Sequence, residues 1–83
     1  MIFIIAGNYR QAQEIALHEN LRPAQWRYVE QNNYYRLQGY TEYDIIWGGT
    51  YYDRSDYLSN KLQAELYHYK TVGKTFTERV SDW

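Results

Sequence analysis

Two arginines that follow glycine-containing loops are the residues of this 83-residue chain best suited to binding chemistry. The first loop reads Gly-Asn-Tyr-Arg over 7–10, and the second reads Gly-Gly-Thr-Tyr-Tyr-Asp-Arg over 48–54. Each loop follows an apolar run and precedes a helical pattern. A cation at a helix start is unfavourable by about 0.3–1 kcal/mol unless an anion is close, because the helix N-terminus carries a partial positive charge. Guanidinium groups beside free backbone N–H groups would suit a phosphate or a carboxylate.

We therefore predict a ligand site where the two loops meet. In a parallel sheet both loops lie at the carboxyl ends of their strands, which is where open α/β sheets bind ligands. Tyrosine rings in the loops would stack on a base or border a peptide. The predicted ligand is a nucleotide or another phosphate-bearing small molecule. The predicted ligand-binding residues are Gly7, Asn8, Tyr9, Arg10, Gly49, Thr50, Tyr51 and Arg54.

Local ion pairs are the alternative explanation for these arginines. Asp53 and Asp56 lie close to Arg54 in the chain, and Glu14 follows Arg10 by one helical turn. Arginines paired in this way need no ligand. Neither loop has the Gly-Lys-Ser/Thr ending of a P-loop, and no Gly-x-Gly-x-x-Gly follows either strand.

Catalysis and metal binding find little support in the sequence. His18 and His68 lie far apart in the chain, without a partner at metal-ligand spacing. Thr50, Ser55 and Ser59 have no histidine-plus-acid arrangement that spacing can identify. We therefore predict a non-enzymatic binding protein with no catalytic residue, no metal ligand and no cofactor.

Composition leaves two other functions open. Nine basic and ten acidic residues give a net charge of −1, which argues against a nucleic-acid binder driven by bulk charge. Eleven tyrosines and three tryptophans suit an interface, so the second candidate is an inhibitor that blocks a host protein with a Tyr-rich surface. A third candidate, an accessory to single-stranded nucleic acid, rests on aromatic residues around one cation. These residues are Tyr34, Tyr35, Arg36, Tyr40 and Tyr43.

The opening MIFIIAG run is too short for a signal-peptide core or a membrane span, and it lacks a basic flank. The absence of cysteine excludes a disulfide scaffold and is consistent with a reducing compartment. We predict a cytoplasmic protein without membrane contact.

Hydrophobic patterns predict an α/β domain with the element order β-α-β-β-α. The predicted domain covers 1–70, and 71–83 form a tail that packs on the sheet or becomes ordered in an oligomer. The sequence does not decide whether that tail contains a short strand or a helical turn. The predicted strands are 2–6, 26–29 and 43–47, the predicted helices are 9–19 and 57–69, and 34–37 form a single helical turn.

These elements favour a small three-stranded parallel sheet in the order 2-1-3, half of a doubly wound, Rossmann-like fold. A hairpin between the second and third strands, giving a mixed sheet, is the alternative. If both helices packed on one face, the other face would be bare. We then expect the tail or a second copy to cover it, and so we predict a homo-oligomer.

The segments MIFIIAGNYRQAQEIA, WRYV and GGTYYDR together resemble small proteins encoded by tailed bacteriophages. The likeness covers about the first 60 residues. It implies a viral protein that binds and inhibits a host protein or sequesters a host signalling nucleotide. In that context Arg10 and Arg54 become candidate contacts.

Overall fold

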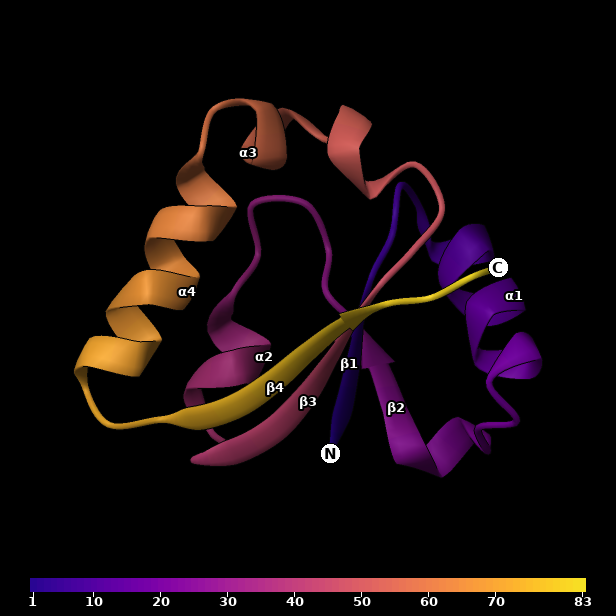
Figure 1. Ribbon diagram of the computed structural model, residues 1–83, viewed down its shortest axis with the longest axis horizontal. Coiled ribbons are helices and arrows are strands. Elements are labelled where there is room, and N and C mark those ends of the chain that lie inside the picture. Colours follow the sequence, from indigo (N-terminus) through magenta and orange to yellow (C-terminus); the bar gives the residue numbers. More distant parts are fainter.

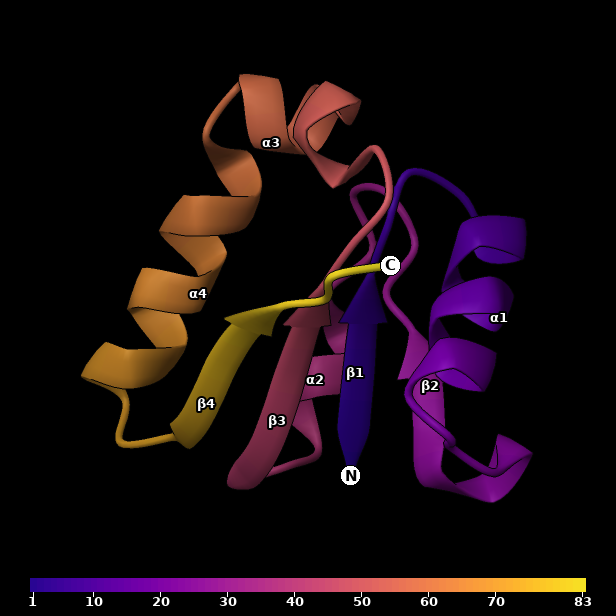
Figure 2. The ribbon, with the colours of Figure 1, turned by 45° about the vertical axis from the view of Figure 1, so that its right-hand side comes forward.

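The protein is an α/β unit built on a four-stranded sheet with all strands parallel. The computed structural model describes residues 1–83, apart from the side chain of Tyr35. The strands are β1 (Ile2–Ile5), β2 (Trp26–Tyr28), β3 (Glu42–Trp47) and β4 (Thr75–Val80). Their order is β2-β1-β3-β4, so the predicted order of the first three strands is confirmed and a fourth is added (Figure 2).

The alternative of a mixed sheet with a hairpin is wrong. β2 and β3 flank β1 instead of pairing with each other: Ile2 is in register with Trp26 on one side and with Asp44 on the other. The central position of β1 explains its continuous apolar sequence, because side chains on both of its faces are covered.

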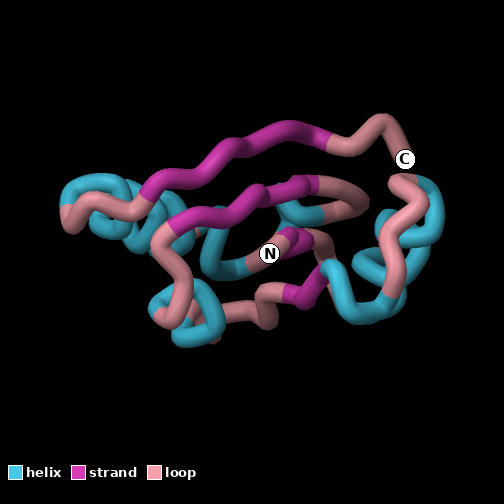
Figure 3. The backbone as a smooth tube through the Cα atoms, turned by 90° about the horizontal axis from the view of Figure 1, so that it is seen from below, coloured by secondary structure: helices cyan, strands magenta, loops and turns pink.

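The C-terminal tail adds the fourth strand to the sheet. β4 pairs in parallel with β3 from Glu42↔Thr75 to Trp47↔Val80. It therefore extends the sheet at one edge and does not lie across a face. Beyond β4 the chain turns across the sheet and ends beside the first helix (Figures 1 and 3).

The helices are α1 (Tyr9–His18), α2 (Tyr35–Gln38), α3 (Ser55–Leu58) and α4 (Lys61–Thr71). Asn8 caps α1 as predicted, with its side chain accepting a hydrogen bond from the Gln11 N–H at 2.9 Å. The single helix predicted over 57–69 is wrong, because the chain breaks between α3 and α4. Asn60 adopts a left-handed φ of 61° at this break, a conformation that asparagine tolerates better than most residues.

The two longest helices cover opposite faces of the sheet (Figure 1). On one face Ile4 and Ile46 pack against Ile15 of α1, together with neighbouring alanines. On the other face, β-strand residues such as Phe3 pack against α2 and α4, including Leu66. The expectation of two helices on one face is therefore wrong. Because helices cover both faces, no second copy is required to cover a bare face. Homo-oligomerisation stays a prediction.

Within the described part of the chain, no helix has both the length and the apolar character needed to cross a bilayer.

Candidate functional site

The two predicted loops do meet at the carboxyl ends of β1 and β3, and Gln11 joins them. Its Oε1 accepts hydrogen bonds from the Gly7 N–H and the Thr50 N–H, both at 2.9 Å. Its Nε2 donates to Thr50 Oγ1 at 3.1 Å. The chain leaves β1 and β3 toward opposite edges of the sheet, so this is the crevice where such sheets usually bind ligands. Here Gln11 accepts hydrogen bonds from the backbone N–H groups that a ligand would otherwise bind.

The glycines of these loops serve close packing. A Cβ atom added at Gly7 would lie 2.0 Å from Thr50 Oγ1. Gly49 has a φ of +58°, and a Cβ atom there would lie 2.3 Å from Gln11 Oε1 and 3.2 Å from the ring of Trp83. Both glycines are thus required by contacts within the protein, without reference to a ligand.

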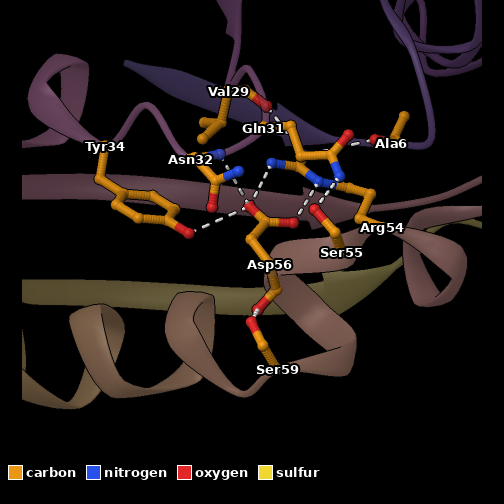
Figure 4. Close-up of polar contacts among 9 residues, drawn as sticks. All are labelled: Ala6, Val29, Gln31, Asn32, Tyr34, Arg54, Ser55, Asp56 and Ser59. Atoms are coloured by element: carbon orange, nitrogen blue, oxygen red, sulfur yellow. Dashed lines mark hydrogen bonds and ion pairs between the residues drawn. The ribbon is translucent and has the colours of Figure 1, made fainter.

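Arg54 lies in the interior, only 2% exposed, and it binds protein groups through its whole guanidinium (Figure 4). Nε and Nη2 donate to the two carboxylate oxygens of Asp56 at 2.9 and 2.7 Å. Nη1 donates to the carbonyls of Ala6 at 3.3 Å and Val29 at 2.8 Å. Arg54 therefore ties the ends of β1 and β2 to the start of α3.

Asp56 is held as a carboxylate by this network. Burial alone would raise its pKa, but hydrogen bonds from Arg54, from the Asn32 N–H and from the Tyr34 hydroxyl outweigh burial and lower it. In the same contact, burial and the Asp56 charge raise the pKa of Tyr34. Arg54 and Asp56 are both buried, and together they have the character of a structural ion pair.

Arg10 lies on the surface of α1, with 88% of its side chain exposed and its Nε 3.7 Å from Glu14 Oε1. The structure therefore gives each predicted anion-binding arginine a carboxylate of its own, Asp56 for Arg54 and Glu14 for Arg10. The premise of two unpaired guanidinium groups flanking one crevice is wrong. Of the other predicted residues, Tyr51 packs against Trp47 in a separate aromatic cluster.

A different hollow lies along β2, the outer strand at one edge of the sheet. Its volume is about 210 Å³. Tyr9 stacks on Trp26 with ring centroids 6.1 Å apart, and it meets Tyr28 edge-on at 5.8 Å. Trp26 and Tyr28 alternate around Arg27, which places both rings on the same face of β2. This hollow, the β2 groove, is lined by Tyr9, Pro23, Trp26, Arg27, Tyr28, Glu30 and Arg36.

Two guanidinium groups face the β2 groove in different ways. Arg27 Nη1 donates to the Trp26 carbonyl at 2.9 Å and to the Pro23 carbonyl at 3.4 Å, so it covers part of the sheet edge. Arg36 Nη2 lies 4.0 Å from Glu30 Oε1, and its Nε is buried without a hydrogen-bond partner among the described atoms. A buried donor without a partner is rare in folded proteins and calls for an explanation.

The stacking surface predicted around Arg36 is for the most part core. Tyr40 and Tyr43 pack edge-on against Phe3, and the Tyr34 hydroxyl donates to Asp56. The side chain of Tyr35 lies outside the described residues.

His18, Glu19 and Asp82 place ligand atoms within 4.8 Å of one another, so they could approach a metal ion. However, Glu19 already accepts hydrogen bonds from Arg79 and Ser81. The hydrogen bond from Arg79 lowers the Glu19 pKa, while His18 hydrogen-bonds to Asp82 at 2.7 Å and lowers the Asp82 pKa. These contacts fasten the C-terminal segment to α1.

Sequence reasoning missed Gln11 and most of the β2 groove. Gln11 carried no recognisable signal, because a glutamine in the first turn of a helix is common. The Trp-Arg-Tyr alternation of β2 did carry one, since it places two aromatic rings on one face. Comparison with protein-family models, with curated proteins and with solved structures finds no match to this chain.

Proposed function

We propose that this protein is a non-enzymatic binding protein whose β2 groove holds a phosphate-bearing planar molecule, a nucleotide in its simplest form. The observation that carries the proposal is the combination of three aromatic rings with the partly exposed Arg36 side chain, whose buried Nε has no partner among the described atoms, around one hollow. We further infer that the domain is half of a doubly wound fold, as its strand order and two-sided helix cover suggest.

The planar part of the ligand would stack on Tyr9 and Trp26. Tyr9 is largely exposed, so its ring can tilt without disturbing the core. Stacking of a base on an aromatic side chain contributes about 1–3 kcal/mol. The groove of about 210 Å³ is smaller than the roughly 300–1,000 Å³ of typical ligand sites, which suits one planar group with its sugar and phosphate reaching outside.

The phosphate would bind at Arg36. The Glu30 carboxylate is 4.0 Å away and both side chains are substantially exposed, so this pair is weak and a phosphate can replace Glu30. Guanidinium groups bind phosphate through paired, charge-assisted hydrogen bonds. Arg27 would add positive charge at the other side of the groove while keeping its carbonyl contacts.

Thermal unfolding with a panel of nucleotides tests this proposal. A ligand at 100 times its Kd adds about 2.7 kcal/mol of stability, which corresponds to a rise in Tm of roughly 10 °C or more for a domain of this size. Nucleoside alone and inorganic phosphate alone should each give a smaller rise. Arg36→Gln and Tyr9→Ala should remove most of the rise, whereas Arg10→Gln should retain it. A rise of equal size in Arg36→Gln would contradict the proposal.

A protein-blocking role is the second candidate, and exposed apolar side chains favour it. Leu58, Tyr67 and Val72 are each more than half exposed, and all three lie on or next to α3 and α4. A chain with this role alone would keep the same Tm with every nucleotide of the panel, so one experiment separates the two candidates.

A further inference from the structure

Three aromatic rings form a corner on the side of the sheet opposite to α1. Trp47 ends β3, Tyr51 belongs to the short helical turn Tyr51–Asp53, and Tyr57 belongs to α3. The ring planes meet at 58° (Trp47 with Tyr51), 70° (Trp47 with Tyr57) and 88° (Tyr51 with Tyr57), and the centroids lie 5.2 to 6.0 Å apart. We call these residues the aromatic corner.

A pocket of about 270 Å³ opens beside the aromatic corner, where Gln63 of α4 and Glu78 to Val80 of β4 complete its wall. Of the three rings that line it, Trp47 is almost fully buried and the two tyrosines are half-buried. An apolar cavity of about 150 Å³ is sufficient for benzene, so the pocket has room for a compact organic group.

The charges around the pocket favour a cation. Glu78 Oε1 accepts a hydrogen bond from Trp47 Nε1 at 3.2 Å, which holds the carboxylate beside the indole ring. Aromatic faces are electron-rich and attract cations. Arg79 also lines the pocket, but its guanidinium is paired with Glu19 on the α1 side of the sheet.

The protein already places one of its own cations next to this carboxylate. Lys70 Nζ lies 3.7 Å from Glu78 Oε2 and 5.1 Å from the centroid of the Phe76 ring. The Lys70 side chain is 56% exposed and that of Glu78 is 35% exposed, so this ion pair is weak. A second cation could therefore compete with Lys70 for Glu78.

We propose that the aromatic corner and Glu78 bind a methylated ammonium group. Such a group has few or no N–H donors to satisfy, so rings and one carboxylate suffice to replace its water shell. Aromatic cages of this kind are the known mode of recognition for choline and methylated lysine. Choline and methylated lysine present the same chemical group, so either could supply the ligand. This site is separate from the β2 groove.

Titration with tetramethylammonium, followed in ¹H–¹⁵N spectra by the indole N–H of Trp47, tests the proposal. We expect saturable shifts of this signal, because its donor contacts Glu78. tert-Butanol, which has a similar shape and no charge, should cause no saturable shift over the same concentrations. Equal binding of tert-butanol would overturn the proposal, because it would show an apolar pocket without charge selectivity. Absence of any saturable shift with tetramethylammonium would overturn it too.

Variants sharpen the test. Glu78→Gln and Tyr57→Leu should each weaken binding about 5- to 30-fold, as expected for loss of a desolvated cation contact. Lys70→Gln should tighten binding, because it removes the competing cation. Tyr67→Leu, at a ring that is 74% exposed on α4 outside the pocket, should leave binding unchanged. Glu78→Gln keeps the pocket shape, so it remains informative if Tyr57→Leu unfolds.

Choline and a peptide containing trimethyllysine distinguish the source of the group. Tighter binding of the peptide than of tetramethylammonium would support a protein partner, and tighter binding of choline would support a small molecule. Unchanged affinity in Glu78→Gln for all three probes would refute the assigned site.

Discussion

Replacing Arg54 by methionine tests whether this arginine is structural. Its guanidinium makes four hydrogen bonds, two to Asp56 and one each to the carbonyls of Ala6 and Val29. Methionine retains part of the side-chain volume but supplies no donor. Arg54→Met therefore leaves a buried carboxylate without its cation and two buried carbonyls without this partner.

The expected loss is large compared with the stability of the whole domain. Breaking a buried ion pair by removing one partner costs about 3–5 kcal/mol. A chain of 83 residues has a free energy of unfolding of about 4–12 kcal/mol. Arg54→Met should thus lose at least about a quarter of the free energy of unfolding and unfold at a clearly lower urea concentration. Arg54→Met with Asp56→Leu removes both charges and should regain much of the loss. Arg10→Met, at an exposed pair, should change stability by about 0.5 kcal/mol or less.

The pH dependence gives a second readout. In the native protein the pKa of Asp56 is lowered from its ordinary 3.8, so its contribution to stability is present above about pH 4 and lost as pH falls through the lowered pKa. Without Arg54, burial dominates and raises this pKa. The variant should therefore lose stability as pH rises from about 4 toward neutrality, the opposite direction.

Urea unfolding followed by far-UV circular dichroism between pH 4 and 7.5 measures both effects. A loss below about 1 kcal/mol at neutral pH, or the same pH slope as the unmodified protein, would refute the structural assignment of Arg54.

Two matched pairs of substitutions test other contacts. Gly7→Ala should destabilise the protein by about 1–3 kcal/mol, because the new Cβ would lie 2.0 Å from Thr50 Oγ1, whereas Gly39→Ala meets nothing within 4 Å and should be tolerated in thermal unfolding. Tyr43→Phe should leave stability unchanged or raise it, since the buried Tyr43 hydroxyl has no partner among the described atoms. Tyr69→Phe should cost about 0.5–1.5 kcal/mol, because it loses the hydrogen bond from the Tyr69 hydroxyl to the Tyr34 carbonyl. Ultraviolet titration should show the phenol of Tyr43 ionising only near pH 12, because burial raises its pKa to about 12, and Tyr43→Phe should remove that step.

The sequence predicted the parts of the fold that depend on local pattern. The apolar run after Met1 is typical of a strand covered on both faces, and Asn8 is typical of a helix cap; both predictions are confirmed. The break at Asn60 was missed because Leu58, Leu62 and Leu66 continue a helical stripe across it. Leu58 is exposed, so this position of the apolar stripe does not pack against the core.

The edge strand and the candidate site were harder to predict. β4 is mostly exposed and pairs with β3 alone, so it carries no continuous apolar signal. The sequence showed that Asp56 could pair with Arg54, but burial of that pair depends on the carbonyls of Ala6 and Val29, which the fold brings together from distant segments. No local pattern encodes that convergence.

The all-parallel order of the strands has a kinetic consequence. Because no two adjacent strands are joined by a tight turn, every pairing in the sheet must close a long loop before it gains any contact. The contacts that fasten the C-terminal segment to α1 join residues 60 to 64 positions apart. High contact order of this kind slows folding, so this small domain should refold well below the speed of helical bundles of equal length. The contacts between the C-terminal segment and α1 close the longest of these loops and should form late.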